Sequence, residues 1–310
     1  MRIICDQHIP FLPEAVRNEW PQVEILPLQP EAIDASAVQN ADVLVVRTRT
    51  RVDEALLSGS SVRLVCTATI GFDHIDTAYC EAHGIRWMAC PGCNAQAVCD
   101  YVEEALNETQ AQGTIGIVGV GHVGSLVAKM VEQRGMRVLL NDPPKGIGVS
   151  LDEIAQQCDI ITFHVPLDNS TYHLCDETFL KACKPGALII NAARGGVVDE
   201  AALLRSGHPY ILDTWEHEPD IHPEVLAHAL RASMHIAGYS VEGKRNATQI
   251  CLNGIAEVFE LPRIDISGYH YAGIPASQQK SNEPWLAAIT HSLKAHPDQF
   301  ETLRKNYPLR

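Results

Sequence analysis

The sequence lacks a long apolar run. No stretch of about 18 consecutive apolar residues, the length that a membrane-spanning helix needs, occurs among its 310 residues. Its start, MRIICDQHIPFLPEAVRNEW, has no apolar core followed by a small-residue cleavage site, so we expect no secretory signal peptide. These absences predict a cytoplasmic protein that does not act on a membrane.

Basic residues are scarce. Lysine and arginine total 24 against 38 aspartate and glutamate residues, which gives a formal net charge of -14. A chain this acidic does not present the basic surface that nucleic acids or anionic membranes require. We therefore expect a small-molecule partner.

The ten cysteines lack the regular spacing of a disulfide framework. Cys90 and Cys93 nevertheless form a Cys-x-x-Cys pair, and Cys99 follows. A structural zinc site commonly uses two such pairs, and the chain has no second one. Cys80 and His83 lie near enough in sequence to complete four ligands, so a zinc site and a redox dithiol both stay open until the neighbouring motifs are interpreted.

Short apolar runs alternate with helix-like segments in the first 92 residues. The runs are RIIC at 2–5, VEILPL at 23–28, DVLVVR at 42–47 and VRLVCTA at 62–68. Runs of this length, rich in Val, Ile and Leu, are typical of buried parallel strands. The alternation predicts a small doubly wound α/β domain.

A second alternation follows a predicted long helix at 95–112. Its predicted strands lie at 114–120, 137–142, 159–165, 187–193 and 210–215. The intervening segments are long enough for helices, so we expect a second parallel sheet. From about Leu261 the periodicity weakens, which suggests a small separate element at the C-terminus.

A glycine motif opens this second region. Gly119-x-Gly121-x-x-Gly124 follows an apolar run, begins a helical pattern and precedes a strand that ends in Asp142. This is the context of the dinucleotide-binding fingerprint, in which the acidic residue accepts hydrogen bonds from the adenosine ribose. The charge of Asp142 would repel the extra phosphate of NADP and so favours NAD. The alternative is a glycine-rich turn without a ligand.

Three charged residues downstream stand in apolar surroundings. Arg194 follows the strand pattern LIINAA, Glu218 precedes a proline just after another strand, and His235 lies in an apolar run. An arginine can hold a carboxylate beside a reacting carbonyl, and a histidine can exchange the hydroxyl proton. A carboxylate beside the histidine would favour its protonated form. The three residue types fit hydride transfer between a hydroxy acid and NAD.

At this point the motifs GVGHVG, NAARGGVVDE, LDTWEHEP and HIAGY, in this order, resemble those of the D-isomer-specific 2-hydroxyacid dehydrogenases. The segments VVRTRTRVDEALL, CTATIGFDHID, PGCNAQAVCDYV, NDPP and HIAGYSVEGK are similar to one branch of that family. Members of this branch oxidise a phosphorylated four-carbon hydroxy acid to its 2-oxo acid with NAD, in the synthesis of pyridoxal phosphate. The resemblance extends over roughly residues 1–260.

The resemblance implies an α/β fold with two doubly wound parallel-sheet domains. A flavodoxin-like lid would comprise 1–93, completed by about 246–262, and a Rossmann NAD domain would comprise 94–245. A short C-terminal element, 263–310, ends in FETLRKNYPLR, which resembles part of the dimerisation domain of longer members. A homodimer is therefore expected.

The resemblance also implies residue roles. Catalysis is assigned to Arg194, Glu218 and His235. Cofactor contacts are assigned to Gly119, Gly121, His122, Val123, Gly124, Asp142, Val165, Asp213 and Gly238. Substrate contacts are assigned to Thr48, Thr69 and Tyr239. Val165 stands where the family often has threonine, so only a backbone contact is expected there. The Cys90–Cys93 pair falls in the loop entering the long helix, where we no longer expect a metal site.

A basic cluster, Arg47-Thr-Arg49-Thr-Arg51, is the candidate site for the substrate's phosphate. Alternate side chains of an extended segment share a face, so Thr48 and the arginines could not all reach one ligand. We therefore expect a loop or bulge near Thr48, with Arg47 or Arg49 turned to the phosphate. The alternative is a solvated basic loop.

Two other functions remain open at this point. The chain could be another D-2-hydroxyacid dehydrogenase, such as a phosphoglycerate or glycerate dehydrogenase. It could also be a non-catalytic NAD-sensing protein on the same fold, which would keep every motif named above.

Overall fold

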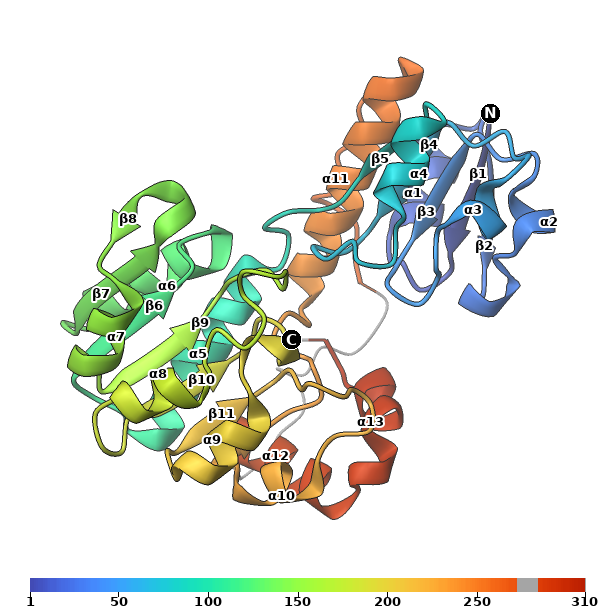
Figure 1. Ribbon diagram of the computed structural model, residues 1–310. Coiled ribbons are helices and arrows are strands. Elements are labelled where there is room, and N and C mark those ends of the chain that lie inside the picture. Colours follow the sequence, from blue (N-terminus) through green and yellow to red (C-terminus); the bar gives the residue numbers. More distant parts are fainter. Residues whose placement is uncertain (272–283, 310) are drawn as a thin grey trace. The chain divides into compact units, whose positions relative to one another are not determined.

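The computed structural model describes residues 1–271 and 284–309, which fall into two compact units (Figure 1). The first unit is Met1–Asn94 with the described residues of Ser240–Ile274, and the second is Ala95–Tyr239 with those of Pro275–Arg310. Each unit is built around its own sheet. None of the described helices has the length and apolar character needed to cross a membrane.

The sheet of the first unit is entirely parallel, in the order β2-β1-β3-β4-β5. This is the flavodoxin-like order, as predicted for the lid. The strands are β1 (Arg2–Asp6), β2 (Glu24–Leu28), β3 (Val43–Val46), β4 (Leu64–Thr67) and β5 (Arg86–Met88). The central strands β3 and β4 are buried along their whole length, which is why their sequence is continuously apolar rather than alternating.

Short helices and one long helix accompany this sheet. The helices are α1 (Leu12–Glu19), η1 (Pro30–Ala32), α2 (Ala35–Val38), α3 (Glu54–Leu57), α4 (Thr77–Ala82) and α11 (Val241–Phe259). Although α11 is far from the sheet in sequence, its residues Cys251, Leu252 and Ile255 join the same core as β1 and β3. The first unit therefore needs a segment from beyond the second unit to complete its core.

The sheet of the second unit has the order β12-β11-β10-β9-β6-β7-β8. All pairs are parallel except β7 with β8. The strands are β6 (Thr114–Val118), β7 (Arg137–Asp142), β8 (Ile147–Gly148), β9 (Ile160–Phe163), β10 (Leu188–Asn191), β11 (Tyr210–Leu212) and β12 (Arg231–Ala232). The strand order reverses between β6 and β9, the point at which a doubly wound sheet binds its ligand. The predicted Rossmann topology is confirmed.

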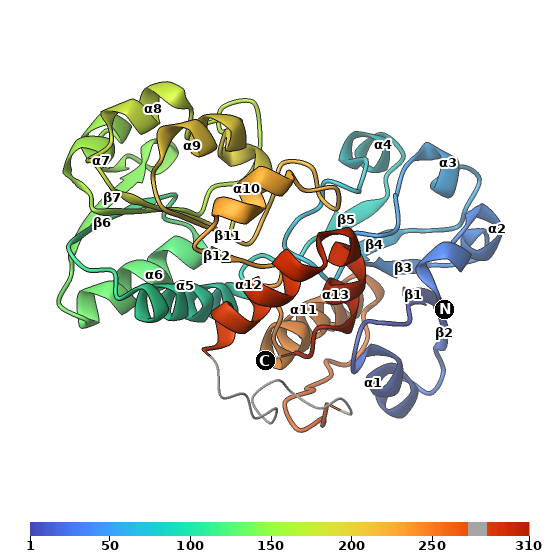
Figure 2. The same cartoon turned by 90° about the horizontal axis from the view of Figure 1, so that it is seen from below.

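Helices lie on both faces of this sheet, with α5 and α6 on one face and α7, α8 and α9 on the other (Figure 2). The helices that precede the C-terminal segment are α5 (Ala95–Thr109), α6 (His122–Gln133), η2 (Pro143–Lys145), α7 (Leu151–Gln157), α8 (Glu177–Ala182), η3 (Gly195–Val197), α9 (Glu200–Ser206) and α10 (Pro223–His228). The faces form two apolar clusters, one containing Phe163 and Leu203 and the other Ile117 and Val102.

The C-terminal residues form α12 (Trp285–Ala295), η5 (Pro297–Gln299) and α13 (Phe300–Asn306). They pack into the second unit, because Leu293 and Phe300 are buried in its core cluster. Trp285 meets Tyr101 of α5 edge-on, with ring centroids 5.8 Å apart. We expected a small separate element here, and the described residues instead extend the second unit.

Every strand predicted from the sequence occurs, and the helix predicted at 95–112 runs from Ala95 to Thr109. Three strands were not predicted, β5, β8 and β12, and they have only three, two and two residues. Such short runs show too little alternation for a strand pattern to be recognised. The boundary between units also differs slightly, because the whole of α11 belongs to the first unit.

Candidate active site

The glycine motif forms a tight turn between β6 and α6. Gly119 has φ +91°, and a Cβ atom there would lie 2.6 Å from the carbonyl oxygen of His164. A Cβ atom on Gly124 would lie 1.9 Å from the carbonyl oxygen of Gly119. Both positions therefore require glycine for reasons internal to the protein.

Gly121 is different. No described atom outside its chain neighbours lies within 4 Å of the place that a Cβ atom would take. Gly121 precedes α6, whose first residues are the exposed His122 and the half-buried Val123. The N-terminus of a helix attracts anions, and the open space at Gly121 lets a phosphate approach the backbone. The site fits the pyrophosphate of a dinucleotide.

Asp142 is the last residue of β7, at the same edge of the sheet. Its Oδ2 accepts a hydrogen bond from the backbone N–H of Val120 at 2.9 Å, which fixes the carboxylate beside the glycine turn. Lys145 lies 3.5 Å from the same oxygen and donates to the carbonyl of Val120. The predicted acidic residue is in place, with a cation beside it.

His164, which the sequence analysis did not single out, follows β9 next to Val165. Its Nε2 lies 3.0 Å from the hydroxyl of Thr162. Burial lowers the pKa of His164 to about 4, so the ring is neutral at physiological pH. Val165 packs against the glycine turn, with its side chain next to Gly119. A polar residue directly after a buried strand was the available signal for His164.

Asp213, predicted as a cofactor contact, is only 1% exposed. Its Oδ1 accepts hydrogen bonds from the Ser233 hydroxyl and the Ile236 N–H, and its Oδ2 accepts one from the Ala237 N–H. These bonds hold the loop that carries His235 and continues to the half-buried Gly238. The structure therefore shows a loop-positioning role for Asp213, and a cofactor contact by it stays a prediction.

That loop holds His235 in an unusual conformation. Its φ is +57°, in the left-handed region that non-glycine residues seldom adopt. The backbone N–H of His235 donates to the carbonyl of Asp213 at 2.7 Å. Strained residues of this kind persist where the surroundings over-determine them, and they cluster at functional sites.

His235 and Glu218 form a hydrogen-bonded pair. The Nδ1 atom of His235 lies 2.8 Å from Oε2 of Glu218, whose Oε1 accepts the backbone N–H of Trp215 at 2.9 Å. Burial by itself would raise the pKa of Glu218. The bond to His235, the charge on that ring, the Trp215 N–H and the charge of Arg304 outweigh burial, so its pKa is lowered. An ionised Glu218 therefore holds Nδ1–H, which leaves Nε2 as the proton acceptor.

Arg194 stands in a turn directly after β10. The buried Asn191 fixes this turn, because its amide donates to the Arg194 carbonyl and its oxygen accepts from the Ala193 N–H. A Cβ atom on Gly195 would lie 1.9 Å from the carbonyl oxygen of Trp215. The turn carrying Arg194 and the loop carrying Glu218 are thus in direct backbone contact.

Tyr239, a predicted substrate residue, lies beside α13. The guanidinium carbon of Arg304 is 6.0 Å from the Tyr239 ring centroid, and the ring of Tyr307 meets it edge-on at 6.5 Å. Burial opposes the charge on Arg304, but Tyr239, Glu218 and Glu301 more than compensate, so its pKa is raised. Arg304 was not predicted as a site residue, because nothing in its sequence spacing links the C-terminal segment to this site.

The basic cluster Arg47–Arg51 lies in the first unit, and its arginines differ in their surroundings. Arg47 forms a two-pronged ion pair with the fully buried Asp6, at 2.8 and 3.2 Å. The predicted break in the strand occurs, since β3 ends at Val46 and the exposed Thr48 and Arg49 form a turn. Of the two arginines proposed for the phosphate, Arg47 is therefore committed to the fold.

Thr69 follows β4 in the first unit. Its hydroxyl lies 2.6 Å from that of Thr67 and donates to the carbonyl of Gly71. Thr67 is in turn 3.0 Å from Nε2 of the buried His74. Burial lowers the pKa of His74, so a neutral ring anchors this chain of hydroxyls. Thr69 is held in a defined orientation before any substrate arrives.

All ten cysteines are free and buried. Cys90 lies 3.6 Å from the sulfur of Cys251 on α11 and donates to backbone carbonyls. Burial, with a smaller effect of Cys90, raises the pKa of Cys93 to about 12. The Cys-x-x-Cys spacing thus belongs to two thiols buried in the core of the first unit, without the low pKa of a reactive dithiol.

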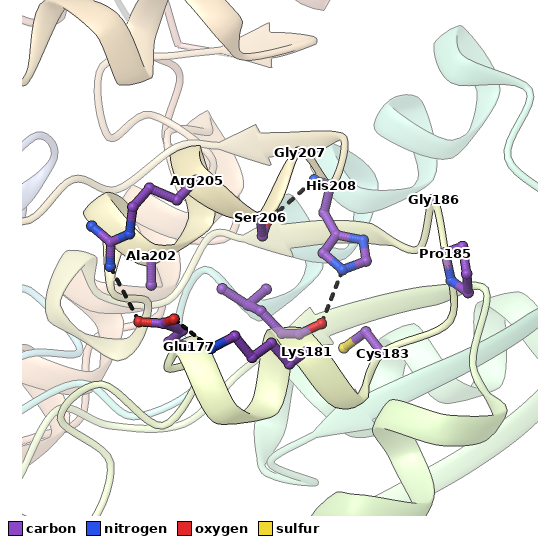
Figure 3. Close-up of a pocket in the computed structure, with 11 residues that line it drawn as sticks. Glu177, Lys181, Cys183, Pro185, Gly186, Ala202, Arg205, Ser206, Gly207 and His208 are labelled. Atoms are coloured by element: carbon purple, nitrogen blue, oxygen red, sulfur yellow. Dashed lines mark hydrogen bonds and ion pairs between the residues drawn. The ribbon is translucent and has the colours of Figure 1, made fainter.

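A cavity of about 410 Å³ opens between α8 and α9 in the second unit (Figure 3). Its two cations, Lys181 and Arg205, both pair with Glu177. None of the predicted catalytic, cofactor or substrate residues lines it. We therefore do not assign the site to this cavity.

This chain is similar in sequence to known proteins. Residues 96–237 match the model of the D-isomer specific 2-hydroxyacid dehydrogenase NAD-binding domain. The chain is 42% identical to an erythronate-4-phosphate dehydrogenase of Bacteroides fragilis, with 100% of this chain and 97% of that protein covered. It is 43% identical to the enzyme of the same name from Klebsiella pneumoniae, with 99% and 91% covered.

Solved structures show the same fold. The NAD+-bound 3-phosphoglycerate dehydrogenase of Entamoeba histolytica superposes with a TM-score of 0.72 at 23% identity, with 84% of this chain and 95% of that chain covered. The D-lactate dehydrogenase of Aquifex aeolicus, complexed with NAD and lactic acid, gives 0.68 at 24% identity, with 84% and 96% covered. This chain belongs to the D-isomer-specific 2-hydroxyacid dehydrogenase family.

Proposed function

We propose that this chain oxidises 4-phospho-D-erythronate to 3-hydroxy-2-oxo-4-phosphobutanoate with NAD, a step in pyridoxal phosphate biosynthesis. The observation that carries the proposal is the His235–Glu218 pair at 2.8 Å, in contact through its loop with the turn of Arg194. The pair lies in the same unit as the glycine turn of a dinucleotide-binding sheet. The chain is also about two-fifths identical, over its full length, to enzymes named for this substrate.

The residues divide the chemistry between them. Nε2 of His235 takes the proton of the C2 hydroxyl, while ionised Glu218 stabilises the protonated ring that results. The planar guanidinium of Arg194 binds the C1 carboxylate and polarises the developing carbonyl. NAD, when bound, would accept the hydride that leaves C2. The proton and the hydride therefore leave the same carbon–oxygen unit.

The cofactor assignment rests on the glycine turn. The open space at Gly121 accepts a pyrophosphate, and Asp142 at the end of β7 is placed to accept hydrogen bonds from a ribose. His122, Val123, Val165, Asp213 and Gly238 remain proposed cofactor contacts. NAD is preferred to NADP because a carboxylate repels the additional phosphate.

Substrate contacts are proposed for Thr48, Thr69 and Tyr239. Since Arg47 is paired with Asp6, Arg49 is our preferred ligand for the distal phosphate. Its place in the turn after β3, together with the exposed hydroxyl of Thr48, supports this choice. Charge-assisted hydrogen bonds to a phosphate are each worth about 1.5–3 kcal/mol.

Turnover with the purified chain tests the proposal. Phosphorylated and unphosphorylated 2-hydroxy acids, including 3-phosphoglycerate and glycerate, are offered with NAD while absorbance at 340 nm is followed. Parallel assays add a 2-oxo acid, which detects turnover if NADH stays bound. We expect preference for 4-phosphoerythronate. Preference for a different acid reassigns the substrate, whereas NAD binding without turnover of any acid favours a sensing protein.

We also propose a cytoplasmic homodimer. Ten free, buried thiols are typical of a reducing compartment. The homodimer rests on the resemblance of the last residues to a dimerisation domain. Light scattering coupled to gel filtration tests it, with twice the 34.0 kDa chain mass expected.

A further inference from the structure

Glu200 and Glu216 hold each other through their backbones. The Oε1 atom of Glu200 accepts the N–H of Glu216 at 2.8 Å, and Oε2 of Glu216 accepts the N–H of Glu200 at 3.2 Å. Glu200 is the first residue of α9 and is only 4% exposed. We call this reciprocal pair, Glu200 and Glu216, the carboxyl clasp.

The carboxyl clasp joins the two loops that carry the proposed catalytic residues. Glu200 follows the turn of Arg194 by six positions, and Glu216 precedes Glu218 by two. The same loops touch where Gly195 meets the carbonyl of Trp215. A change at the clasp therefore moves Glu218 relative to Arg194.

The other oxygen of Glu216 is held as well. Its Oε1 lies 2.6 Å from Nε2 of His173, and Nδ1 of that ring is 3.8 Å from Asp199. His173 has a left-handed φ of +51°, and its N–H donates to the carbonyl of Gly196 in the Arg194 turn. Both carboxylate oxygens of Glu216 thus have partners fixed to the Arg194 side.

Glu200 faces mostly acidic groups. Burial is the main cause that raises the pKa of Glu200 to about 7, with contributions from the charges of Glu216 and Glu218, against the opposing effect of the Glu216 N–H. Burial, together with Glu200, raises the pKa of the facing Tyr210 to about 12. Burial therefore opposes the ionised form of Glu200, whereas the Glu216 N–H favours it.

We propose that Glu200 and Glu216 are positioning residues, which hold Glu218 against His235 through their reciprocal backbone hydrogen bonds. This inference rests on the proposed function, because it takes the roles of Glu218 and His235 from there. Neither clasp residue needs to touch substrate or cofactor. Their effect passes through the backbone of residues 215–218.

Two substitutions separate shape from charge. Glu200→Gln keeps an oxygen that can accept the Glu216 N–H but cannot ionise, whereas Glu200→Ala removes the acceptor. Glu224→Gln, at an exposed carboxylate in the first turn of α10, is the matched control. We expect Glu200→Ala to lower kcat about 10- to 100-fold, since small misplacements of catalytic groups cost this much, with the KM for NAD unchanged.

We expect Glu200→Gln to restore kcat to within about twofold of the original chain at both pH 6.5 and pH 8.5, because its side-chain oxygen still accepts the Glu216 N–H. Equal losses in both variants at both pH values, or no loss in Glu200→Ala, overturn the proposal. A crystal structure of Glu200→Ala that keeps the 2.8 Å separation of Glu218 and His235 overturns it too, independently of any substrate.

Thermal unfolding tests the burial of the Glu200 carboxyl directly, even if Glu200→Ala does not fold. Because folding raises the pKa of Glu200 from 4.5 to about 7, the unsubstituted chain loses stability relative to Glu200→Gln as pH rises through this window. We expect the difference in Tm to grow between pH 4.5 and 7 and then level off. A flat difference shows that the Glu200 carboxyl is not buried in the clasp in solution, and overturns the proposal. Absence of turnover in the unsubstituted chain, with the pH-dependent Tm difference intact, instead refutes the proposed function.

Discussion

The loops after β10, β11 and β12 in the second unit differ from the segment Arg47–Arg51 in the first in how their charged side chains are held. In the second unit, buried side chains other than the functional ones bond to the backbone of each loop. Asn191 secures the turn of Arg194, and Asp213 secures the loop of His235. In the first unit the charged side chain is itself part of the structural contact, because Arg47 forms an ion pair with the buried Asp6.

This difference separates residues that hold a site from residues that serve it. Polar residues buried beneath the second unit's loops leave Arg194 and His235 half-buried and available. In the first unit the two roles fall to neighbouring arginines. Arg47 stabilises the fold, and Arg49 lies in the exposed turn. Substitutions should therefore reduce activity in the loops of the second unit and stability at Arg47.

The largest effect is expected at His235. His235→Ala removes the proton acceptor, and general acid–base catalysis is typically worth about 10²–10⁴-fold in rate. The left-handed backbone should tolerate the change poorly but stay held by Asp213. The measurement is kcat/KM with 4-phosphoerythronate, alongside the affinity for NADH by fluorescence, which should be nearly unchanged. Near-normal turnover in His235→Ala would contradict the assignment.

The sequence predicted the loops of the second unit better than the basic cluster for a physical reason. Arg194, Glu218 and His235 each follow a strand of a parallel sheet, and the carboxyl ends of such strands meet at one edge. For Arg194 and Glu218 the predicted strands are then enough, whereas β12, the strand before His235, was missed and only an apolar run marked that position. The partner of Arg47 is Asp6, 41 positions away on another strand, and no local pattern reveals which arginine has such a partner.

Arg304 and Asp213 show the same limit. Arg304 reaches Tyr239 only because α13 folds back onto the second unit, a long-range contact without periodicity. Asp213 follows a strand like the catalytic residues, and its sequence position alone could not distinguish a cofactor ligand from a residue whose oxygens hold a loop. Its burial and its bonds to Ser233, Ile236 and Ala237 reveal the loop-holding role, and burial of a single polar side chain is a property of the folded chain.

The next largest effect is expected on stability at Arg47. Arg47→Ala leaves the carboxylate of Asp6 buried without its cation, and breaking such a pair typically costs about 3–5 kcal/mol. Urea unfolding followed by circular dichroism measures the loss. Asp6→Asn combined with Arg47→Ala should recover part of it, because the uncompensated charge is gone. If Arg47→Ala unfolds at the same urea concentration as the original chain, the ion pair does not stabilise the first unit.

Arg49→Ala is the contrasting change in the same turn. Because Arg49 is exposed, we expect a smaller change in unfolding than at Arg47, but a KM for 4-phosphoerythronate raised about 10- to 100-fold, the equivalent of one charge-assisted bond. Unphosphorylated erythronate should respond little. Equal losses on the two acids would place the phosphate elsewhere, and Arg51→Ala, at an exposed arginine next to Asp53, is the matched control.

A smaller effect is expected at Glu218. Glu218→Gln keeps an oxygen for the Trp215 N–H but removes the negative charge 2.8 Å from His235. Since the same contact lowers the pKa of Glu218, removing the charge withdraws its support from the protonated ring, and the acid limb of the pH–rate profile should move toward acid. Glu224→Gln should leave the profile in place. An unmoved acid limb in Glu218→Gln would separate Glu218 from the catalytic histidine.

The smallest effect concerns the choice of cofactor at Asp142. Asp142→Asn retains an oxygen for the Val120 N–H but loses the charge that repels the 2′-phosphate of NADP. Lys145, 3.5 Å from this carboxylate, already offsets part of the repulsion, so we expect the ratio of kcat/KM for NADP over NAD to rise only about tenfold. Lys145→Gln should move the ratio in the opposite direction, because the carboxylate is then uncompensated. Since the two side chains interact directly, the effects of the two substitutions on this ratio should not be additive in the double variant. If the original chain uses the two cofactors equally well, Asp142 does not discriminate between them, and the selectivity assigned to the end of β7 is wrong.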